Sequence, residues 1–327
     1  MPSSLPAAVP RVLLVKTSSL GDVIHNLPVA SDLAARFPGI ELDWLVEEPF
    51  AEIPALHPAV RRVIPVALRR WRKALFSRQT WREVSAFRQQ LAAERYLAVL
   101  DTQGLLKSAL LACRACGRHL GYDAASAREP LAARFYETRF AVPKGQHAVV
   151  RNRMLAAAAF DYELPKTLDY GLAQSRENTM PQGSSAVLLT AASREDKLWP
   201  DAHWVVLGRA LAERGLTPLL PGGSILERRR ARDLAAQIPG AQAIPPMSLT
   251  ALADLLRHAR LAVGVDTGLS HLAAAVETPV LALYTATEPG LTGVYGVGWH
   301  RNLGGKGKTP AVAEVLAALQ PVLKGQA

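Results

Sequence analysis

The segment RVLLVKTSSLGDVIHNLP, residues 11–28, is typical of a strand, a short loop and the start of a helix. Residues 12–15 form an apolar run that predicts a buried parallel strand, which Lys16 and Thr17 end. From Asp22 onward, apolar residues recur with the period of an amphipathic helix. Such a junction directs backbone N–H groups and a helix N-terminus into one crevice, where doubly wound sheets place their ligands.

A single carboxylate, Asp22, lies at this junction. From the residues alone, two interpretations stay open. Asp is common as a helix cap at such a position, and the same carboxylate can also act on a ligand held in the crevice.

The alternation of strand and helix continues through the whole chain. In the first half we expect further strands at 40–46, 63–66, 97–101 and 119–122. In the second half we expect them at 186–190, 217–221, 241–245, 261–266 and 280–285, with helices starting near residues 200, 224, 248, 267 and 310. This pattern predicts two similar α/β halves. Residues 162–185 are rich in Pro, Gly and polar residues and are expected to link them, whereas residues 298–309 are expected to form a mobile loop.

Composition fits this organisation. The chain has 327 residues, of which 49% are hydrophobic and 20% charged, so we expect a globular protein with room for two domains. The formal charge of +10 is uneven: residues 1–160 hold 22 Lys and Arg against 13 Asp and Glu, and residues 161–327 hold 16 against 15. The first half is therefore expected to meet an anionic partner.

Terminal and cysteine signals favour a cytoplasmic chain. The opening MPSSLPAAVP lacks a basic region, and Lys16 interrupts the apolar run behind it, so we expect neither a signal peptide nor a spanning helix. The two cysteines, Cys113 and Cys116, form one CxxC in a stretch expected to be helical, with no second pair to complete a zinc site. Buried or idle thiols are favoured over redox chemistry.

Several common catalytic motifs are missing from the sequence. No GxGxxG follows the first strand, and no GxxxxGK[ST], GxSxG or HExxH occurs anywhere. These absences disfavour dehydrogenases, NTPases, serine hydrolases and zinc proteases.

Residues 69–82 form the densest block of charge. Six cations and no acid fall within these fourteen residues, interleaved with Trp71, Phe76 and Trp81. The block is consistent with a solvated helix face, with a nucleic-acid surface, or with a pocket for a polyanionic molecule or a dock on an anionic membrane leaflet. The last interpretation is favoured because Arg forks hold phosphate and carboxylate and because aromatic residues suit a membrane interface.

A second strand-to-helix junction lies at LAVGVDTGLSHLAAA, residues 261–275. Asp266 ends the strand, Thr267 and Gly268 form the turn, and His271 follows in the helix. Backbone amides there are suited to cradle a diphosphate, although Asp266 can also serve only as a cap.

Two further loops reach the same sheet edge. TAASREDKLWP, residues 190–200, carries Ser193 and Lys197, and Lys197 is either a surface lysine or a cation that neutralises a phosphate. Glu227 follows the turn at 221–224, where a carboxylate either favours the helix dipole or accepts hydrogen bonds from a ribose diol.

Six segments in order resemble one known family: VKTSSLGDVIHNLP, RRWRK, DTQGLLKSA, SAREP, DKLWP and VDTGLSHLAAA. Between about residues 11 and 296 the chain resembles the bacterial lipopolysaccharide heptosyltransferase I family. The resemblance implies a GT-B glycosyltransferase, an α/β protein with two Rossmann-like domains whose parallel sheets face across a cleft. The acceptor domain would span residues 1–170 and the ADP-heptose domain 171–327, with the last helix, about 310–324, packing back toward the first domain.

The resemblance also implies the reaction. L-glycero-D-manno-heptose would pass from ADP-heptose to the first Kdo of Kdo2-lipid A, with inversion and without metal or other cofactor. The enzyme would lie at the cytoplasmic face of the inner membrane, against an anionic membrane surface and with no nucleic-acid partner. Two alternatives are a sister heptosyltransferase that adds a later heptose and a non-catalytic module that binds anionic ligands; the basic block favours Kdo as the acceptor over a neutral heptose.

Site residues follow from the positions that match the family's motifs. Asp22 is implied as the general base, and Lys197 as the cation that stabilises the departing diphosphate. Donor-binding positions are Ser193, Lys197, Glu227, Met247, Asp266, Thr267, Gly268 and His271, and acceptor-binding positions are Ser19, Gly21, Arg69, Arg70, Lys73, Lys107 and Arg128.

The chain departs from the family pattern at two places. The paired hydroxyl residues of the family's donor loop are Ala192 and Ser193 here, which puts one side-chain phosphate contact in question, and Ala286 stands where a proline is usual.

Overall fold

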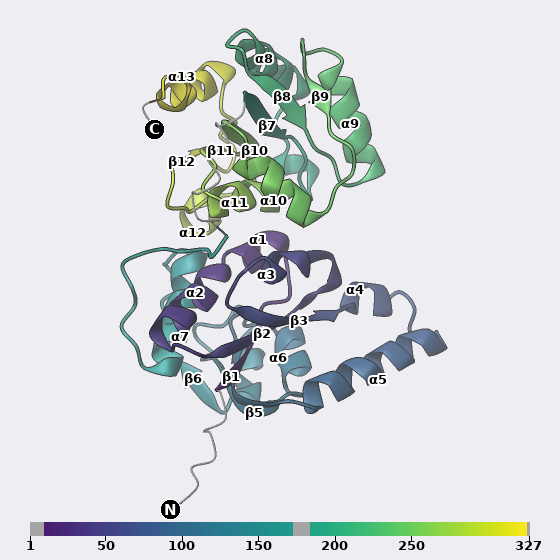
Figure 1. Cartoon of the computed structure of the whole chain (residues 1–327), viewed down its shortest axis with the longest axis vertical. Coiled ribbons are helices and arrows are strands. Elements are labelled where there is room, and N and C mark those ends of the chain that lie inside the picture. Colours follow the sequence, from purple (N-terminus) through teal and green to yellow (C-terminus); the bar gives the residue numbers. More distant parts are fainter. Residues whose placement is uncertain (1–9, 173–183, 326–327) are drawn as a thin grey trace, which may run out of the picture. The chain divides into compact units, whose positions relative to one another are not determined.

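The computed structural model describes residues 10–172 and 184–325, which fall into two compact units, 1–171 and 172–327 (Figure 1). The division lies inside the expected linker at 162–185, of which residues 173–183 lie outside the described part. Each unit is built on its own six-stranded sheet in which every strand pair is parallel.

The sheet of the first unit has the strand order β3-β2-β1-β4-β5-β6. Its strands are β1 (Arg11–Val15), β2 (Glu41–Glu47), β3 (Val60–Val66), β4 (Arg95–Asp101), β5 (Cys116–Tyr122) and β6 (Thr138–Phe140). Its helices are α1 (Leu20–Ile24), α2 (Leu27–Arg36), η1 (Glu48–Phe50), α3 (Glu52–Ala55), α4 (Leu68–Trp71), α5 (Arg78–Ala92), α6 (Leu106–Ala112), η2 (Pro130–Phe135) and α7 (Ala148–Phe160). The chain passes outward from β1 in both directions, so the carboxyl end of β1 lies at the point where the strand order reverses.

Strand β1 is buried on both faces, which explains its uninterrupted apolar run. Leu13 and Val15 belong to a core cluster that includes residues from α5 and α6, and Val12 and Leu14 are equally buried. A parallel strand covered on both sides has no solvent face and so needs no polar alternation. The helix expected from Asp22 is interrupted at residues 25 and 26, and α2 begins with Pro28 in its first turn, where proline fits best.

The sheet of the second unit has the order β12-β11-β10-β7-β8-β9. Its strands are β7 (Ser185–Leu189), β8 (Thr217–Leu220), β9 (Gln242–Ala243), β10 (Leu261–Val265), β11 (Val280–Tyr284) and β12 (His300–Gly304). Its helices are η3 (Glu195–Lys197), α8 (Asp201–Ala212), α9 (Ile225–Ala235), α10 (Leu249–Arg257), α11 (Gly268–Ala275), α12 (Pro289–Thr292) and α13 (Val312–Leu323).

The last helix, α13, packs in the core of the second unit. Val315, Leu319 and Val322 join Trp204 of α8 in one apolar cluster, and Trp199 Nε1 donates a hydrogen bond of 2.9 Å to the carbonyl of Pro310 just before the helix. The expectation that this helix also packs back toward the first unit stays a prediction.

Two expectations from the sequence were wrong, and one strand was missed. Residues 298–309 are not simply a loop, because β12 lies within them and pairs in parallel with β11. Residues 138–140 form a strand, β6, that was not expected. The CxxC is not inside a helix: Cys113 follows the end of α6 and Cys116 begins β5, and both thiols are free and exposed.

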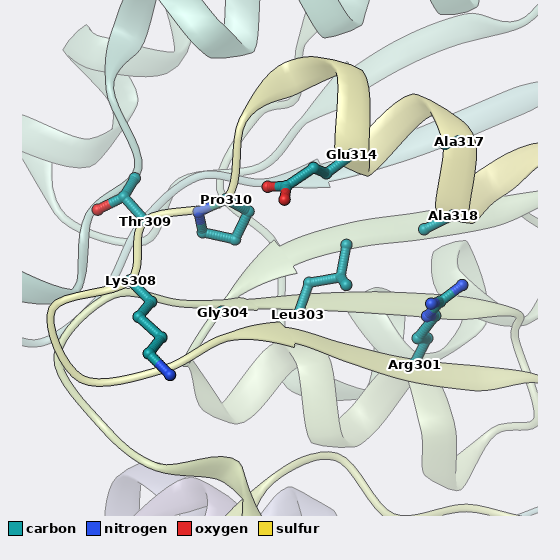
Figure 2. A pocket seen from close by; sticks show the side chains of 9 residues that line it. All are labelled: Arg301, Leu303, Gly304, Lys308, Thr309, Pro310, Glu314, Ala317 and Ala318. Carbon is teal, nitrogen blue, oxygen red and sulfur yellow. The ribbon is translucent and has the colours of Figure 1, made fainter.

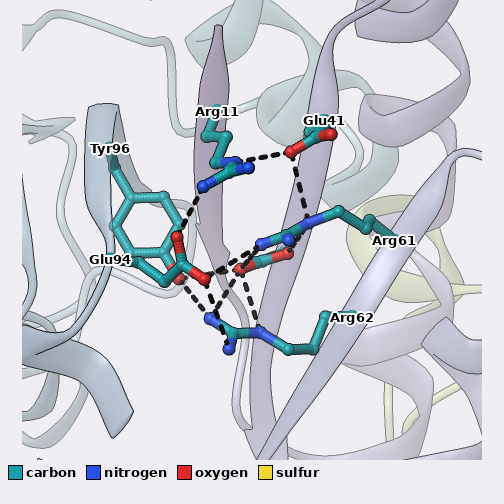
Figure 3. Close-up of polar contacts among 7 residues, drawn as sticks. Arg11, Glu41, Arg61, Arg62, Glu94 and Tyr96 are labelled. Carbon is teal, nitrogen blue, oxygen red and sulfur yellow. Dashed lines mark hydrogen bonds and ion pairs between the residues drawn. The ribbon is translucent and has the colours of Figure 1, made fainter. Parts of the chain in front are cut away.

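A network of charges joins the first four strands near their amino ends (Figure 3). Asp43 is 1% exposed, and its carboxylate accepts hydrogen bonds from Arg61, from Arg62 and from the Tyr96 hydroxyl at 2.8 Å. Glu41 and Glu94 extend the network by pairing with Arg11. These side chains satisfy one another, which lets a buried carboxylate remain in the core.

Candidate active site

The loop after β1 is held from below by a buried lysine. Lys16 is 5% exposed, and its Nζ donates to the carbonyl of Thr102 at 2.7 Å and to Oδ1 of Asn152 at 3.2 Å. Burial lowers the pKa of Lys16 to about 8, against the opposing effect of the Asp22 charge. The Lys16 amino group therefore links the loop after β1 to the residue that follows β4 and to α7.

The loop after β4 clamps the loop after β1. Gln103 Nε2 donates to the Ser18 carbonyl at 2.6 Å, while its Oε1 accepts from the backbone N–H groups of Thr17 at 2.9 Å and Ser18 at 3.3 Å. Lys107 Nζ donates to Ser18 Oγ at 2.8 Å. Two loops that are 85 residues apart along the chain thus form one rigid wall.

The two carboxylate oxygens of Asp22 have different partners. Its Oδ2 accepts from the Ser19 backbone N–H at 2.8 Å and from Ser19 Oγ at 3.1 Å, which satisfies the start of α1. Its Oδ1 lies 3.5 Å from a terminal nitrogen of Arg128, and the Asp22 side chain is 25% exposed. One oxygen serves the helix while the other remains within reach of a ligand.

Arg128 is placed by its neighbour. Glu129 accepts a hydrogen bond from the Leu106 backbone N–H at 2.6 Å through its Oε2, and its own N–H donates to the Gly104 carbonyl at 3.0 Å. This holds the segment around Arg128 against the start of α6. The structure therefore brings Ser19, Asp22 and Arg128 together and places Lys107 on the same loop system; the catalytic and acceptor-binding roles that the resemblance implies for them stay predictions.

Two buried carboxylates at this edge were missed by the sequence analysis. Asp101, at the end of β4, accepts from the Gln103 N–H, from Ser108 Oγ and from the Tyr136 hydroxyl, each at 2.8 Å. Burial raises its pKa. The signal available in the sequence was an acid at the end of an apolar strand, but its partners Ser108 and Tyr136 are seven and 35 residues away.

Glu47 is the second of these carboxylates. It ends β2, is 2% exposed, and its N–H donates to the Thr17 carbonyl at 3.0 Å. Burial raises the pKa of Glu47, and the nearby charges of Arg69 and Lys107 oppose that rise. Glu47 is therefore an acidic group close to Arg69 and Lys107, two cations that were expected to face the acceptor.

The basic block is partly neutralised in space. Arg70 donates to both oxygens of Glu48 at 3.1 Å and to Glu83 at 2.8 Å, so its guanidinium is occupied by two carboxylates. Arg69 lies over the ring of Phe50 with its Cζ 5.5 Å from the ring centroid. Within the described ranges, Arg69 and Lys73 form no ion pair, so these two cations are better placed than Arg70 to meet an anion.

In the second unit, a partly buried ion pair lies where β10 ends. Lys197 Nζ is 2.7 Å from Oδ2 of Asp266, and the two side chains are 17% and 14% exposed. Thr287 Oγ1 donates to the same oxygen at 2.7 Å. Because one oxygen of Asp266 holds Lys197 in place, the remaining ammonium hydrogens keep a fixed direction at the sheet edge.

Helix α11 starts immediately beside this pair. Thr267 is its N-cap residue, Gly268 is its first residue, and His271 is buried in its first turn. Ser270 Oγ donates to the Val265 carbonyl at 2.8 Å, and a Cβ on Gly264 would lie 2.3 Å from that Oγ. Gly264 thus allows the helix to lie close against β10, with its N-terminal amides at the sheet edge.

Glu227 caps its own helix. Its Oε2 accepts from the backbone N–H groups of Gly223 at 2.9 Å and Ser224 at 2.8 Å, and its N–H donates to Ser224 Oγ at 3.2 Å. The helix-end role is therefore present, and the ribose role stays a prediction. Ser193 and Met247 are exposed on the loops after β7 and β9, at the same sheet edge but without a hydrogen bond to Lys197 or Asp266 in the described structure.

The described residues contain neither a cluster suited to a metal ion nor a helix suited to cross a membrane. In residues 10–172 and 184–325, no group of three or more His, Cys, Asp or Glu side chains is arranged to hold a metal ion. Over the same residues, no helix combines the length and the apolar character needed to span a membrane.

Residues 84–316 match the family model of glycosyltransferase family 9 (heptosyltransferase). The chain is 51% identical over 290 residues to lipopolysaccharide heptosyltransferase 1 of Pseudomonas aeruginosa, which covers 88% of this chain and 81% of that protein. The chain belongs to glycosyltransferase family 9.

Solved structures agree with this membership. The Escherichia coli heptosyltransferase WaaC with ADP matches with a TM-score of 0.90 and 45% identity, over 95% of this chain and 99% of that one. The same enzyme with ADP-2-deoxy-2-fluoro heptose matches with a TM-score of 0.86 and 44% identity, over 97% and 100%. The predicted family is confirmed, and so is the α/β fold of the GT-B heptosyltransferases with its two parallel sheets.

In this family 9 protein, each of the two units presents charged groups at the carboxyl edge of its own sheet. The first unit offers a carboxylate flanked by cations, and the second offers a cation and a helix N-terminus. Each set is preformed within its own unit by the hydrogen bonds described above.

Proposed function

We propose that this glycosyltransferase moves L-glycero-D-manno-heptose from ADP-heptose to the first Kdo of Kdo2-lipid A, in the synthesis of the lipopolysaccharide inner core. The observation that carries the proposal is the 51% identity to a lipopolysaccharide heptosyltransferase 1 over 88% of the chain. The match to WaaC with ADP and with an ADP-heptose analogue supports a nucleotide-heptose donor.

The donor belongs to the second unit in this proposal. The diphosphate of ADP-heptose carries its charge next to the bond that breaks, and Lys197 with the amides at Thr267 and Gly268 supplies positive potential at one place. As the bond from the anomeric carbon to the phosphate oxygen breaks, its electron pair goes to ADP. The fixed cation stabilises that developing charge without reorganising.

The acceptor belongs to the first unit. Asp22 takes the proton of the attacking Kdo hydroxyl through the oxygen that does not cap α1. The hydroxyl oxygen then bonds to the anomeric carbon on the face opposite the departing ADP, so the configuration inverts. Arg128, 3.5 Å from Asp22, offers an anionic acceptor a cation beside the base.

The other cations expected at the acceptor site differ in how available they are to bind it. Lys107, Arg69 and Lys73 are suited to the carboxylate and phosphate groups of Kdo2-lipid A. Arg70 already holds Glu48 and Glu83, so its part is to shape the α4 region, and it meets the acceptor only if one of those pairs opens. This ranking replaces the equal treatment of the basic block that its sequence suggested.

We further propose that the reaction needs no metal ion, because Lys197 and the N-terminus of α11 together supply the charge that a metal would otherwise bring to a diphosphate. We also propose that the protein binds peripherally to the cytoplasmic face of the inner membrane. The excess of Lys and Arg in residues 1–160 supports this location.

A screen of donors and acceptors tests the proposal. Purified protein is incubated with ADP-heptose, ADP-mannose or UDP-sugars, each with Kdo2-lipid A or with its heptosylated product, in buffer with and without EDTA, and products are read by mass spectrometry. We expect one heptose to be added to Kdo2-lipid A from ADP-heptose, with EDTA making no difference. Transfer only to the heptosylated product would assign the chain to a later step, and no transfer with any pair would overturn the enzymatic proposal.

A further inference from the structure

A groove of about 380 Å³ lies in the first unit between α4, α5 and α6, at the protruding side of the sheet where Figure 1 shows α4 and α5. Its floor is apolar: Trp71, Val84, Phe87 and Leu111 line it and join the core cluster beneath. None of its lining residues belongs to the candidate active site. The groove is therefore a separate feature of the unit.

The rim of the groove exposes large apolar side chains. Leu75 is 52% exposed, Trp81 57% and Leu110 49%, and all three line the groove. Next to Leu75, Phe76 is fully exposed. Single exposed apolar residues are ordinary, but a cluster around an apolar concavity marks a binding surface.

Charge around the groove is of one sign. Arg72, Arg88 and Arg114 line it, and no Asp or Glu does. Within the described residues none of these three arginines forms an ion pair. By contrast, Arg62 and Arg70 of the same unit pair with carboxylates at 2.9 and 2.8 Å. The three arginines at the groove therefore leave positive charge beside an apolar surface, with no carboxylate in the lining to neutralise it.

We propose that this groove receives an acyl chain of an anionic lipid in the membrane leaflet, with the lipid phosphate held by the arginines. An apolar channel with cations only at its edge is complementary to an amphiphile that has one negative head and a hydrocarbon tail. Exposed Trp and Phe beside arginine are the side chains that favour the boundary between water and lipid. A nucleic acid would use the cations but leave the aliphatic floor unfilled, so it fits less well.

The inference deepens the proposed function and rests on it for the choice of a membrane as the partner. It assigns to the enzyme a contact with the leaflet that is separate from recognition of the sugar acceptor. Lipid binding is measured on the protein alone, whereas the proposed function is measured by heptose transfer, so failure of either can be recognised without the other.

Chain contact is tested by fluorescence quenching. The full protein is mixed with vesicles of phosphatidylglycerol whose acyl chains carry bromine, and tryptophan emission is compared with that on unbrominated vesicles. We expect quenching in the wild type and loss of part of it in Trp81→Phe, which keeps an aromatic ring in place, because Trp71 on the floor of the groove remains within reach of the bromine. Binding without any bromine quenching would show attachment by charge alone and would overturn the acyl-chain assignment.

Affinity is tested by vesicle co-sedimentation. Leu110→Asp places a negative charge at the rim and is expected to weaken binding to phosphatidylglycerol vesicles at least tenfold, about 1.4 kcal/mol. Arg88→Gln is expected to weaken it about fivefold. The matched control is Val206→Asp, at a 51% exposed apolar residue on α8 of the second unit, which should bind as the wild type does.

Three results would refute the proposal: equal binding to phosphatidylcholine and phosphatidylglycerol, unchanged binding in Leu110→Asp, or the same loss in Val206→Asp. Thermal unfolding of each variant shows whether its fold is intact, and quenching of the wild type decides the question even if Leu110→Asp does not fold. Binding of a nucleic acid in preference to the vesicles would also count against a lipid groove.

Discussion

Replacing Asp22 by Asn separates the two tasks that the structure gives to this side chain. The Asn amide oxygen can still accept from the Ser19 backbone N–H, which Asp22 now holds at 2.8 Å, so the cap on α1 survives. The amide cannot take a proton from an acceptor hydroxyl. We therefore expect kcat to fall by about 10²- to 10⁴-fold, which is about 3 to 5 kcal/mol of transition-state stabilisation.

Asp22→Ala loses both tasks and calibrates the structural part. Loss of the cap is expected to cost about 1 kcal/mol of unfolding free energy, which lowers the Tm by about 2 to 4 °C for a unit of this size. Its kcat should fall as far as that of Asp22→Asn. Asp169→Asn provides the matched control, because Asp169 also accepts from a backbone N–H, that of Gly171 at 2.7 Å, outside the candidate site.

The measurements are initial rates of heptose transfer, calorimetric binding of ADP-heptose and thermal unfolding. Donor affinity should stay within about twofold of the wild type in both Asp22 variants, since the donor is assigned to the second unit. The reasoning is refuted if Asp22→Asn turns over within about threefold of the wild type. It is equally refuted if rate and Tm fall together in Asn and Ala alike, because Asp22 would then be structural only.

Three further outcomes follow from other parts of the structure. Lys197→Met should lower kcat about 10²- to 10³-fold with a smaller change in ADP affinity, and an unchanged kcat would exclude charge stabilisation by Lys197. Asp32→Ala, which leaves Arg153 charged and 6% exposed without its carboxylate, should cost about 3 to 5 kcal/mol in urea unfolding; a loss under about 1 kcal/mol would contradict a buried ion pair. Burial lowers the pKa of His57 to about 4, so the unfolded state binds more protons between pH 6.5 and 4 and stability falls as pH falls through that window. The loss should reach about 3 kcal/mol and be smaller in His57→Gln, and parallel pH profiles would show that His57 is not its source.

The periodic elements of the fold could be predicted because each is encoded locally. The apolar runs of β1 and β10 indicate strands that are buried on both faces. The predicted starts of α8, α9, α10 and α11 lie within one residue of the observed starts. Strand β12 could not be found in this way. It is an edge strand with a half-exposed sequence, HRNLG, and it is fixed by pairing with β11 rather than by its own pattern.

The site residues also divide into those encoded by a local motif and those defined by distant partners. Asp22, Lys197 and Asp266 could be proposed because each lies at or just after the carboxyl end of a strand, within a short motif that resembles the family's. The occupation of Arg70 could not be seen, since Glu48 is 22 residues before it and Glu83 is 13 residues after it. Asp101 and Glu47 were missed for a related reason: an acid at a strand end gains its meaning from burial and from partners on other elements.

The charge network around Asp43 has a consequence for how the first unit can change over time. It lies near the amino ends of the strands, where Arg11, Glu41, Arg61, Arg62 and Glu94 balance one another (Figure 3). We therefore expect substitutions in the loops at the opposite edge to leave the alignment of these strands intact, because the ion pairs that join the strands lie at the other end. Figure 2 shows a pocket of the second unit in which Arg301 of β12 and Glu314 of α13 both belong to the lining. In the first unit the network fixes the amino ends of the strands, so that the sequences of the loops at the carboxyl ends can change without loss of strand pairing.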